Sequence, residues 1–297
     1  MSTQKYLKTL GPVSAKFISD LKERGQSIFT IKEAQDLLGK NTREAALLMS
    51  DLAKRQIAYR LNKGTYLLLE TMQESTQLSN WPLIANALMA NNDYYISHYA
   101  AMRLHGMTTH ALTEIQIALP KRCRDKEIYH IRYHFIYTKP EHFWGIEQKW
   151  VSKQHKVKVS DLERTILDCF NRTEYCGGLI ELVKGIWSIQ AKINWERLIE
   201  YSYRYSNKAA VKRLGYVLES LNIGNVYSNR LHNVIKDAQD YIPLDPMGEK
   251  AGNYYKKWYI RVNVENIEVH LKRIYKKSNS IALAKNSYKY FYLIFYE

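Results

Sequence analysis

Apolar residues near the N-terminus recur at steps of three and four, the spacing of an amphipathic helix. The first such segment, residues 12–24, begins with a proline, which suits the first helical position, and is followed by Gly25, a potential helix cap. The expected apolar stripe consists of Val13, Phe17, Ile18 and Leu21. A short strand is expected next, over residues 27–29.

Two capping boxes follow this helix. In each, a side-chain oxygen can accept from the backbone amide three residues later, where a glutamate reaches back. The first pairs Thr30 with Glu33 and opens a helix that ends at Gly39. The second pairs Asn41 with Glu44 and opens a longer helix. This longer helix should bury Ala45, Leu48, Met49 and Leu52.

A hairpin is expected after these helices, because two strand-like runs, residues 57–60 and 65–69, flank a turn at residues 62–64. Two helices around a glycine-containing turn and a following hairpin are typical of a winged helix-turn-helix, which we assign to residues 1–72. The second helix of such a motif enters the major groove of DNA. The candidate DNA contacts are Thr42, Arg43, Ala46, Leu47, Ser50 and Lys54 on the helix and Arg60, Asn62 and Lys63 on the hairpin. Winged helices also mediate protein contacts, so the pattern alone leaves both roles open.

A polar stretch, residues 73–80, lacks apolar periodicity and is the expected linker to a second domain at residues 81–277. Helices and strands are mixed there without a regular alternation, which favours an α+β fold. The expected helices begin near Trp81, Ser97, Asp161, Gly178, Trp195 and Ala209, and the expected strands cover residues 114–119, 128–137, 156–159 and 255–264. Residues 278–297 form an aromatic, irregular tail that could be an edge strand, a partner contact or an extension of the reading frame.

The chain is strongly basic, with 44 Lys and Arg against 29 Asp and Glu and a formal net charge of +15. Such an excess attracts polyanions, and nucleic acid is the first candidate. Residues 254–259 interleave tyrosine with lysine, a mixture that can stack bases and hold phosphates. The same mixture is more often a strand with one buried aromatic face, and we favour that interpretation.

The cysteines and the apolar stretches limit which class of protein this can be. The three cysteines form no C-x-x-C pair, so a zinc ribbon or a disulfide framework is not expected. No apolar stretch is long enough for a membrane span, and the polar N-terminus has no signal core. These features predict a cytoplasmic protein without a membrane partner.

Several short motifs follow one another along the chain in a recognisable order. They are ISHYAA at residues 96–101, LHG at 104–106, VSDLERT at 159–165 with Asp168, GG at 177–178, KRLGY at 212–216 and LDP at 244–246. This series resembles the AbiEi family of antitoxins from type IV toxin–antitoxin systems, which act in phage defence by abortive infection. The resemblance runs from the N-terminal helices to about residue 265.

The resemblance implies an antitoxin that represses its own operon by binding double-stranded operator DNA, often at inverted repeats. It implies a nucleotidyltransferase-like toxin as partner, which the larger domain would counteract with or without direct contact. It carries over no catalytic residue and no cofactor, so we do not expect an enzyme.

Two alternatives stay open. Asp161, Glu163 and Asp168 could hold a metal ion in a nuclease acting on nucleic acid, although Arg164 lies among them and should pair with Asp168 four residues away. His98 with His105, and His130 with His134, share element faces but match no known metal-ligand spacing. The other alternative is a transcriptional repressor with a sensing domain.

Overall fold

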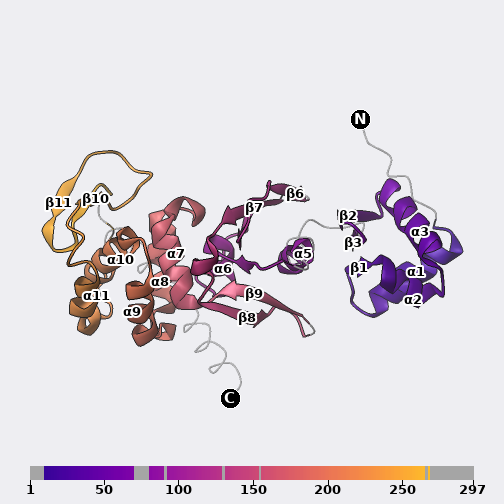
Figure 1. Cartoon of the computed structure of the whole chain (residues 1–297), viewed down its shortest axis with the longest axis horizontal. Coiled ribbons are helices and arrows are strands. Elements are labelled where there is room, and N and C mark those ends of the chain that lie inside the picture. The colour runs from indigo at the N-terminus through magenta and orange to yellow at the C-terminus, as the bar shows by residue number, and fades with distance from the viewer. Residues whose placement is uncertain are drawn as a thin grey trace, which may run out of the picture. The chain divides into compact units, whose positions relative to one another are not determined.

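A computed structural model describes residues 10–69, 80–89, 92–128, 131–153, 155–264 and 267, and these residues form a mixed α+β fold (Figure 1). The chain divides into two compact units. The first unit contains Met1–Ile96, Ala111–His142 and Gln148–Lys158, and the second contains Ser97–His110, Phe143–Glu147 and Val159–Glu297. The expected linker, residues 73–80, lies outside the described residues except for Asn80, and the expected tail at 278–297 lies outside them entirely.

The N-terminal part of the first unit contains three helices and three strands. They are α1 (Pro12–Glu23), β1 (Ile28–Thr30), α2 (Ile31–Leu38), α3 (Thr42–Lys54), β2 (Ala58–Asn62) and β3 (Thr65–Leu68). The strands form an antiparallel sheet in the order β1-β3-β2. Phe17, Phe29, Met49 and Leu52 are fully buried between the helices and this sheet.

Both expected capping boxes are present. The Glu33 amide donates to Thr30 Oγ1 at 3.2 Å, and the Glu44 amide donates to Asn41 Oδ1 at 3.0 Å. Gly39 ends α2 with a left-handed φ of 62°, which a residue with a side chain rarely adopts. One expectation is wrong, because Val13 is 44% exposed and Ser14 takes its place on the buried face of α1.

A six-stranded sheet follows helix α5 (Trp81–Leu88). Its strands are β4 (Tyr95–Ile96), β5 (Glu114–Leu119), β6 (Lys126–Ile128), β7 (Ile131–Tyr137), β8 (Ile146–Trp150) and β9 (Lys156–Ser160), in the order β6-β7-β5-β4-β9-β8. The single strand expected over residues 128–137 is wrong: β6 ends at Ile128 and pairs antiparallel with β7. Strands β4 and β8 were not expected at all.

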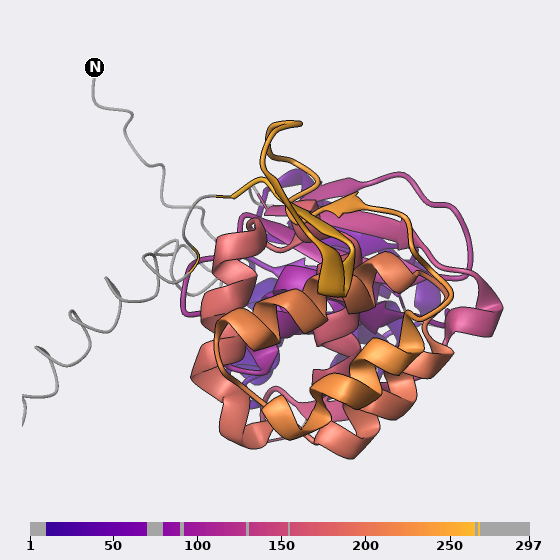
Figure 2. The same cartoon turned by 90° about the vertical axis from the view of Figure 1, so that its left-hand side faces the viewer.

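The second unit is mostly helical, with α6 (His98–Leu104), α7 (Leu162–Asn171), α8 (Leu179–Ile189), α9 (Trp195–Arg204), α10 (Lys208–Ser220) and α11 (Ser228–Val234). Helix α7 packs against α6, α9 and α10, and Figure 2 shows this bundle from its outer side. Short 3-10 helices cover Pro140–His142, Thr173–Tyr175, Gln190–Lys192, Asn225–Tyr227 and Lys256–Trp258.

A small sheet completes the second unit. It consists of β10 (Ile242–Pro243), β11 (Asn253–Tyr255) and β12 (Ile260–Val262), in the order β10-β12-β11. The single strand expected over residues 255–264 is therefore wrong, because the chain turns between β11 and β12 and Tyr259 adopts a left-handed φ of 50°. Trp258, at this turn, is fully buried. Within the described part of the chain, no helix is long and apolar enough to cross a membrane.

Candidate nucleic-acid interface

Helix α3 has one face in the core and one face in solvent. Ala45, Met49 and Leu52 are fully buried, as expected, and Leu48 packs beside them. The opposite side carries the expected contact residues: Thr42, Arg43, Leu47, Ser50 and Lys54 are exposed, and Ala46 is half-buried. Leu47 is 63% exposed, so its apolar side chain is available for contact on this face.

The N-terminus of α3 is held by hydrogen bonds that leave Arg43 available. Gln35 on α2 donates from Nε2 to Thr42 Oγ1 at 2.9 Å, and Glu44 forms an ion pair with Lys40 at 3.8 Å. Within the described residues, Arg43 and Lys54 form no ion pair with a carboxylate. The outward face of α3 therefore presents two cations, Arg43 and Lys54, that are not engaged in an ion pair within the described residues.

The β2–β3 hairpin contributes the other expected contacts. Lys63 is exposed beside Gly64, whose φ is +80°, and Arg60 Nε donates to the Asn62 carbonyl at 3.3 Å. The Asn62 side chain is already engaged: it donates to the carbonyls of Ala87 and Leu88 at 2.9 and 3.0 Å. It also accepts from Lys126 Nζ at 3.0 Å. A DNA contact by this amide would compete with those bonds.

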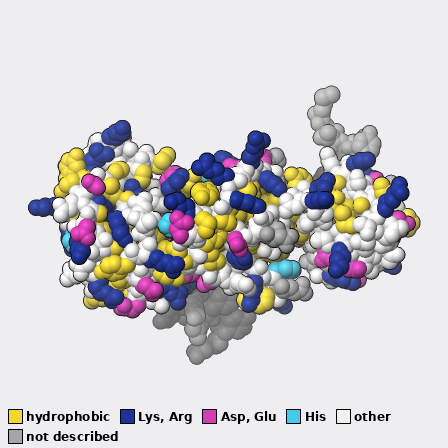
Figure 3. Space-filling model, viewed as in Figure 1, with side chains coloured by type: hydrophobic (Ala, Val, Ile, Leu, Met, Phe, Trp, Pro, Cys, Tyr) yellow, Lys and Arg dark blue, Asp and Glu magenta, His cyan; other side chains and the backbone are white. Residues whose placement is uncertain are grey.

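Cationic side chains are spread over the face of the molecule that Figure 3 shows, and they do not gather in one patch. Residues 254–259 were expected to form a strand with one buried aromatic face, and this is wrong. Tyr254 is 65% and Tyr255 37% exposed, and every residue of β11 is exposed. Only Trp258 in this run is buried. Tyr241 packs edge-on against Tyr254, with ring centroids 4.9 Å apart, so this aromatic group lies on the surface.

The acidic residues of α7, considered above as a nuclease cluster, hold three different structural contacts. Asp161 caps α7 by accepting from the Arg164 amide at 2.9 Å, and its other oxygen accepts from Tyr201 at 2.8 Å. Glu163 accepts from the Asn194 amide at 2.7 Å. Burial, opposed by this hydrogen bond, raises the pKa of Glu163.

The expected pair of Arg164 and Asp168 is confirmed. Arg164 Nε donates to Asp168 Oδ1 at 2.8 Å, and the two side chains are 4% and 5% exposed. Tyr205 donates to the same oxygen at 2.8 Å, and the Arg164 guanidinium lies 4.1 Å from the Trp144 ring centroid. Three or more His, Cys, Asp or Glu side chains able to hold a metal ion are not found together anywhere in the described ranges.

Two of the histidines considered above as metal ligands, His98 and His105, contact other groups of the protein. His98 Nδ1 lies 2.9 Å from Ser97 Oγ, and burial lowers the pKa of His98 to about 4. Ser97 is at the N-cap position of α6 as expected, but its side chain makes no capping bond there. His105 Nε2 lies 2.7 Å from the Ser160 carbonyl oxygen. His130 lies outside the described residues.

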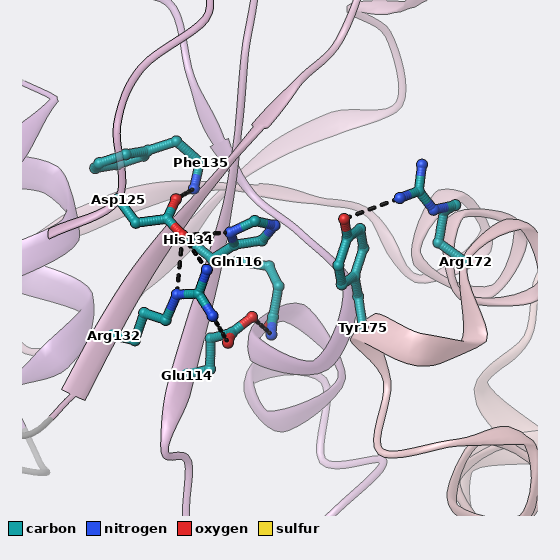
Figure 4. Close-up of polar contacts among 8 residues, drawn as sticks. All are labelled: Glu114, Gln116, Asp125, Arg132, His134, Phe135, Arg172 and Tyr175. Atoms are coloured by element: carbon teal, nitrogen blue, oxygen red, sulfur yellow. Dashed lines mark hydrogen bonds and ion pairs between the residues drawn. The ribbon is translucent and has the colours of Figure 1, made fainter. Parts of the chain in front are cut away.

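A polar network on β5 and β7 was missed in the sequence (Figure 4). Arg132 is paired in register with Glu114, and its guanidinium forms ion pairs with Glu114 at 3.5 Å and with Asp125. His134 Nδ1 lies 2.8 Å from Asp125 Oδ2. Partial burial opposes ionisation of Asp125, but hydrogen bonds from His134, the Phe135 amide and Arg132 lower its pKa below the usual value. Alternation of polar residues along both strands is the signal that indicates a shared face.

These contacts describe a mixed α+β protein in which one face of α3 is exposed and the carboxylates of Asp161, Glu163 and Asp168 contact other groups of the fold. No family model and no curated protein matches the chain. The fold is similar to the crystal structure of the RV2827C protein from Mycobacterium tuberculosis, with a TM-score of 0.65 and 15% sequence identity. The similarity covers 91% of this chain and 96% of that chain, and at this identity it shows a shared fold alone.

Proposed function

We propose that this protein is a cytoplasmic, DNA-binding antitoxin of a type IV toxin–antitoxin system. Its residues 1–72 would form a winged helix-turn-helix that binds double-stranded operator DNA and represses its own operon. Residues 81–277 would counteract a nucleotidyltransferase-like toxin. The proposal rests on the motif series of the AbiEi antitoxins and on the exposed face of α3.

The main observation in favour of DNA binding is that helix α3 has one buried face and one exposed face. Helix α3 is anchored through Ala45, Met49 and Leu52, while Arg43 and Lys54 face solvent. A helix that is fixed from behind by a core can enter a groove without losing its own packing. The order α2, turn, α3 and the β2–β3 hairpin supports the winged-helix assignment.

Each exposed residue has a distinct role in this proposal. Arg43 lies in the first turn of α3, where a guanidinium can donate two parallel hydrogen bonds to guanine. Lys54, Arg60 and Lys63 would contact phosphates, which provide affinity without sequence choice. Thr42 and Ser50 can donate or accept at base edges, and Ala46 and Leu47 can contact thymine methyl groups.

An Arg43→Ala substitution tests the recognition helix. We expect it to weaken binding to the duplex upstream of the gene by at least about fivefold, because each bidentate contact contributes about 1–3 kcal/mol of discrimination. Binding to a shuffled duplex should change much less. The matched control is Arg24→Ala, an exposed arginine after α1. Fluorescence anisotropy measures the affinity of each variant for each duplex. Unchanged operator affinity in a folded Arg43→Ala protein would contradict the assignment of α3 as the recognition helix.

The antitoxin part is tested with the same variant. If repression and neutralisation use separate surfaces, Arg43→Ala should derepress a reporter fused to the upstream region and still rescue cells that express the toxin. A chain that represses but never rescues would instead be a repressor with a sensing domain. Magnesium-dependent cleavage of DNA or RNA, lost on Asp161→Asn in a folded protein, would favour the nuclease.

A further inference from the structure

The hairpin formed by β8 and β9, at one edge of the six-stranded sheet, has a surface that the proposed function does not use (Figure 1). Trp150, the last residue of β8, is 60% exposed. Tryptophan is largely buried in most folds because its ring is the largest apolar side chain. A mostly exposed ring on a strand end is therefore available for contact with a partner.

This hairpin is also basic. Residues 146–160 contain the four lysines Lys149, Lys153, Lys156 and Lys158 against the single acid Glu147, a net charge of +3 (4 − 1). Lys158 forms an ion pair with Asp93 at 3.8 Å. Lys153 is exposed at the turn and has no carboxylate partner in the part of the chain that the structure describes. The charge complements a polyanion.

Lys156 and Trp150 lie close together. Lys156 Nζ is 4.4 Å from the centroid of the Trp150 ring, a cation–π distance. One face of the indole is therefore beside a cation, Lys156, which could also bind a phosphate.

Two hydrogen bonds join described residues near the tip of the hairpin. The Val151 amide donates to the His155 carbonyl at 3.0 Å, and the His155 amide donates to Ser152 Oγ at 3.1 Å. Lys153 and His155 are both exposed.

We propose that the β8–β9 hairpin binds single-stranded nucleic acid, with an unpaired base stacked on Trp150 and the neighbouring phosphates on Lys153 and Lys156. Stacking platforms with interleaved cations are the usual means of binding single strands without sequence choice. Lysines on an edge strand also prevent pairing with other sheets. That role does not require an exposed tryptophan, and an exposed ring works against it.

The test uses the full chain and an unstructured probe, a fluorescein-labelled oligouridylate or oligothymidylate of about twelve nucleotides, a length within the usual site size. Wild-type protein should raise the anisotropy of the probe at low salt. Trp150→Ala should weaken this binding by at least about fivefold, and Trp150→Phe should restore most of it, because a phenyl ring still stacks. The matched control is Tyr203→Ala, which removes an aromatic side chain that is 55% exposed on α9.

The outcome is independent of α3. Trp150→Ala should leave duplex operator binding unchanged, and Arg43→Ala should leave the single-strand affinity within about twofold, the expected effect of one distant surface charge. The proposal is overturned if wild-type protein binds neither the oligouridylate nor the oligothymidylate at low salt. It is also overturned if folded Trp150→Ala binds these oligonucleotides as tightly as wild-type protein does. If Trp150→Ala abolishes rescue from the toxin but binds the probes normally, the hairpin is a protein-docking surface and the proposal is wrong.

Discussion

His98 should make the stability of the second unit depend on pH. Its side chain is buried, and burial lowers its pKa from 6.5 to about 4, although the nearby carboxylate of Asp168 opposes the shift. The unfolded chain therefore binds a proton below about pH 6.5 that the folded chain does not bind until about pH 4. Stability rises with pH where the unfolded state holds more protons, so acidification through this window should destabilise the fold.

The magnitude follows from the two pKa values. With 6.5 in the unfolded chain and about 4 in the folded chain, the contribution changes by about 2 kcal/mol between about pH 7 and about pH 5. The full shift of 2.5 units (6.5 − 4) would cost about 3 kcal/mol below pH 4. Other groups titrate in the same range, so the effect must be isolated by comparison with a variant.

His98→Asn is the matched variant. Asparagine tolerates the left-handed backbone that His98 adopts, with a φ of 48°, and it does not titrate. Urea unfolding, followed by the fluorescence of the buried Trp144 and Trp258, should be measured at both pH values. Wild-type protein should lose about 2 kcal/mol more than the variant on acidification. Equal losses in the two proteins would refute the assignment of a buried, neutral His98.

Three further predictions concern packing, charge and salt. Asp168→Asn leaves the buried Arg164 without its ionic partner and should lower the free energy of unfolding by about 3–5 kcal/mol, whereas Asp51→Asn, which breaks an exposed pair, should change it by less than about 1 kcal/mol. Similar values in urea titrations of both would contradict this. Gly215→Ala would place a Cβ 2.2 Å from the Trp258 ring and should cost about 1–3 kcal/mol by the same assay, so an unchanged midpoint would show that the ring can move. The three cations assigned to phosphates should give a duplex affinity about 40-fold weaker at about 200 mM salt than at about 50 mM, and a flat anisotropy titration would count against them.

The N-terminal elements could be predicted well because their signals are local. The boxes at Thr30 and Asn41 and the cap at Gly39 are set by residues within one turn of each other, and the structure has them as expected. Val13 is the exception. It fits the apolar periodicity of α1, but its side chain is exposed, and the buried position beside it is taken by Ser14.

The errors lie where distant residues decide the structure. The run at residues 255–264 has strand-forming composition, yet the Trp258 ring fits beside Gly215, which has no side chain to block it, and the chain turns there. Polar alternation indicates the shared face of β5 and β7, but it does not indicate that Asp125, just before β6, meets Arg132 and His134 through the pairing of β6 with β7. The roles of the α7 acids likewise depend on partners such as Tyr201, forty residues away.

The most direct test of the account compares two duplexes of equal length and base composition: the sequence upstream of this gene and a shuffled copy. Purified full-length protein should bind the upstream duplex at least about tenfold more tightly at moderate salt, since base contacts from α3 add to phosphate contacts that both duplexes share. Equal affinity for the two duplexes, or no binding to either at low ionic strength, would contradict the claim that the exposed face of α3 reads operator DNA.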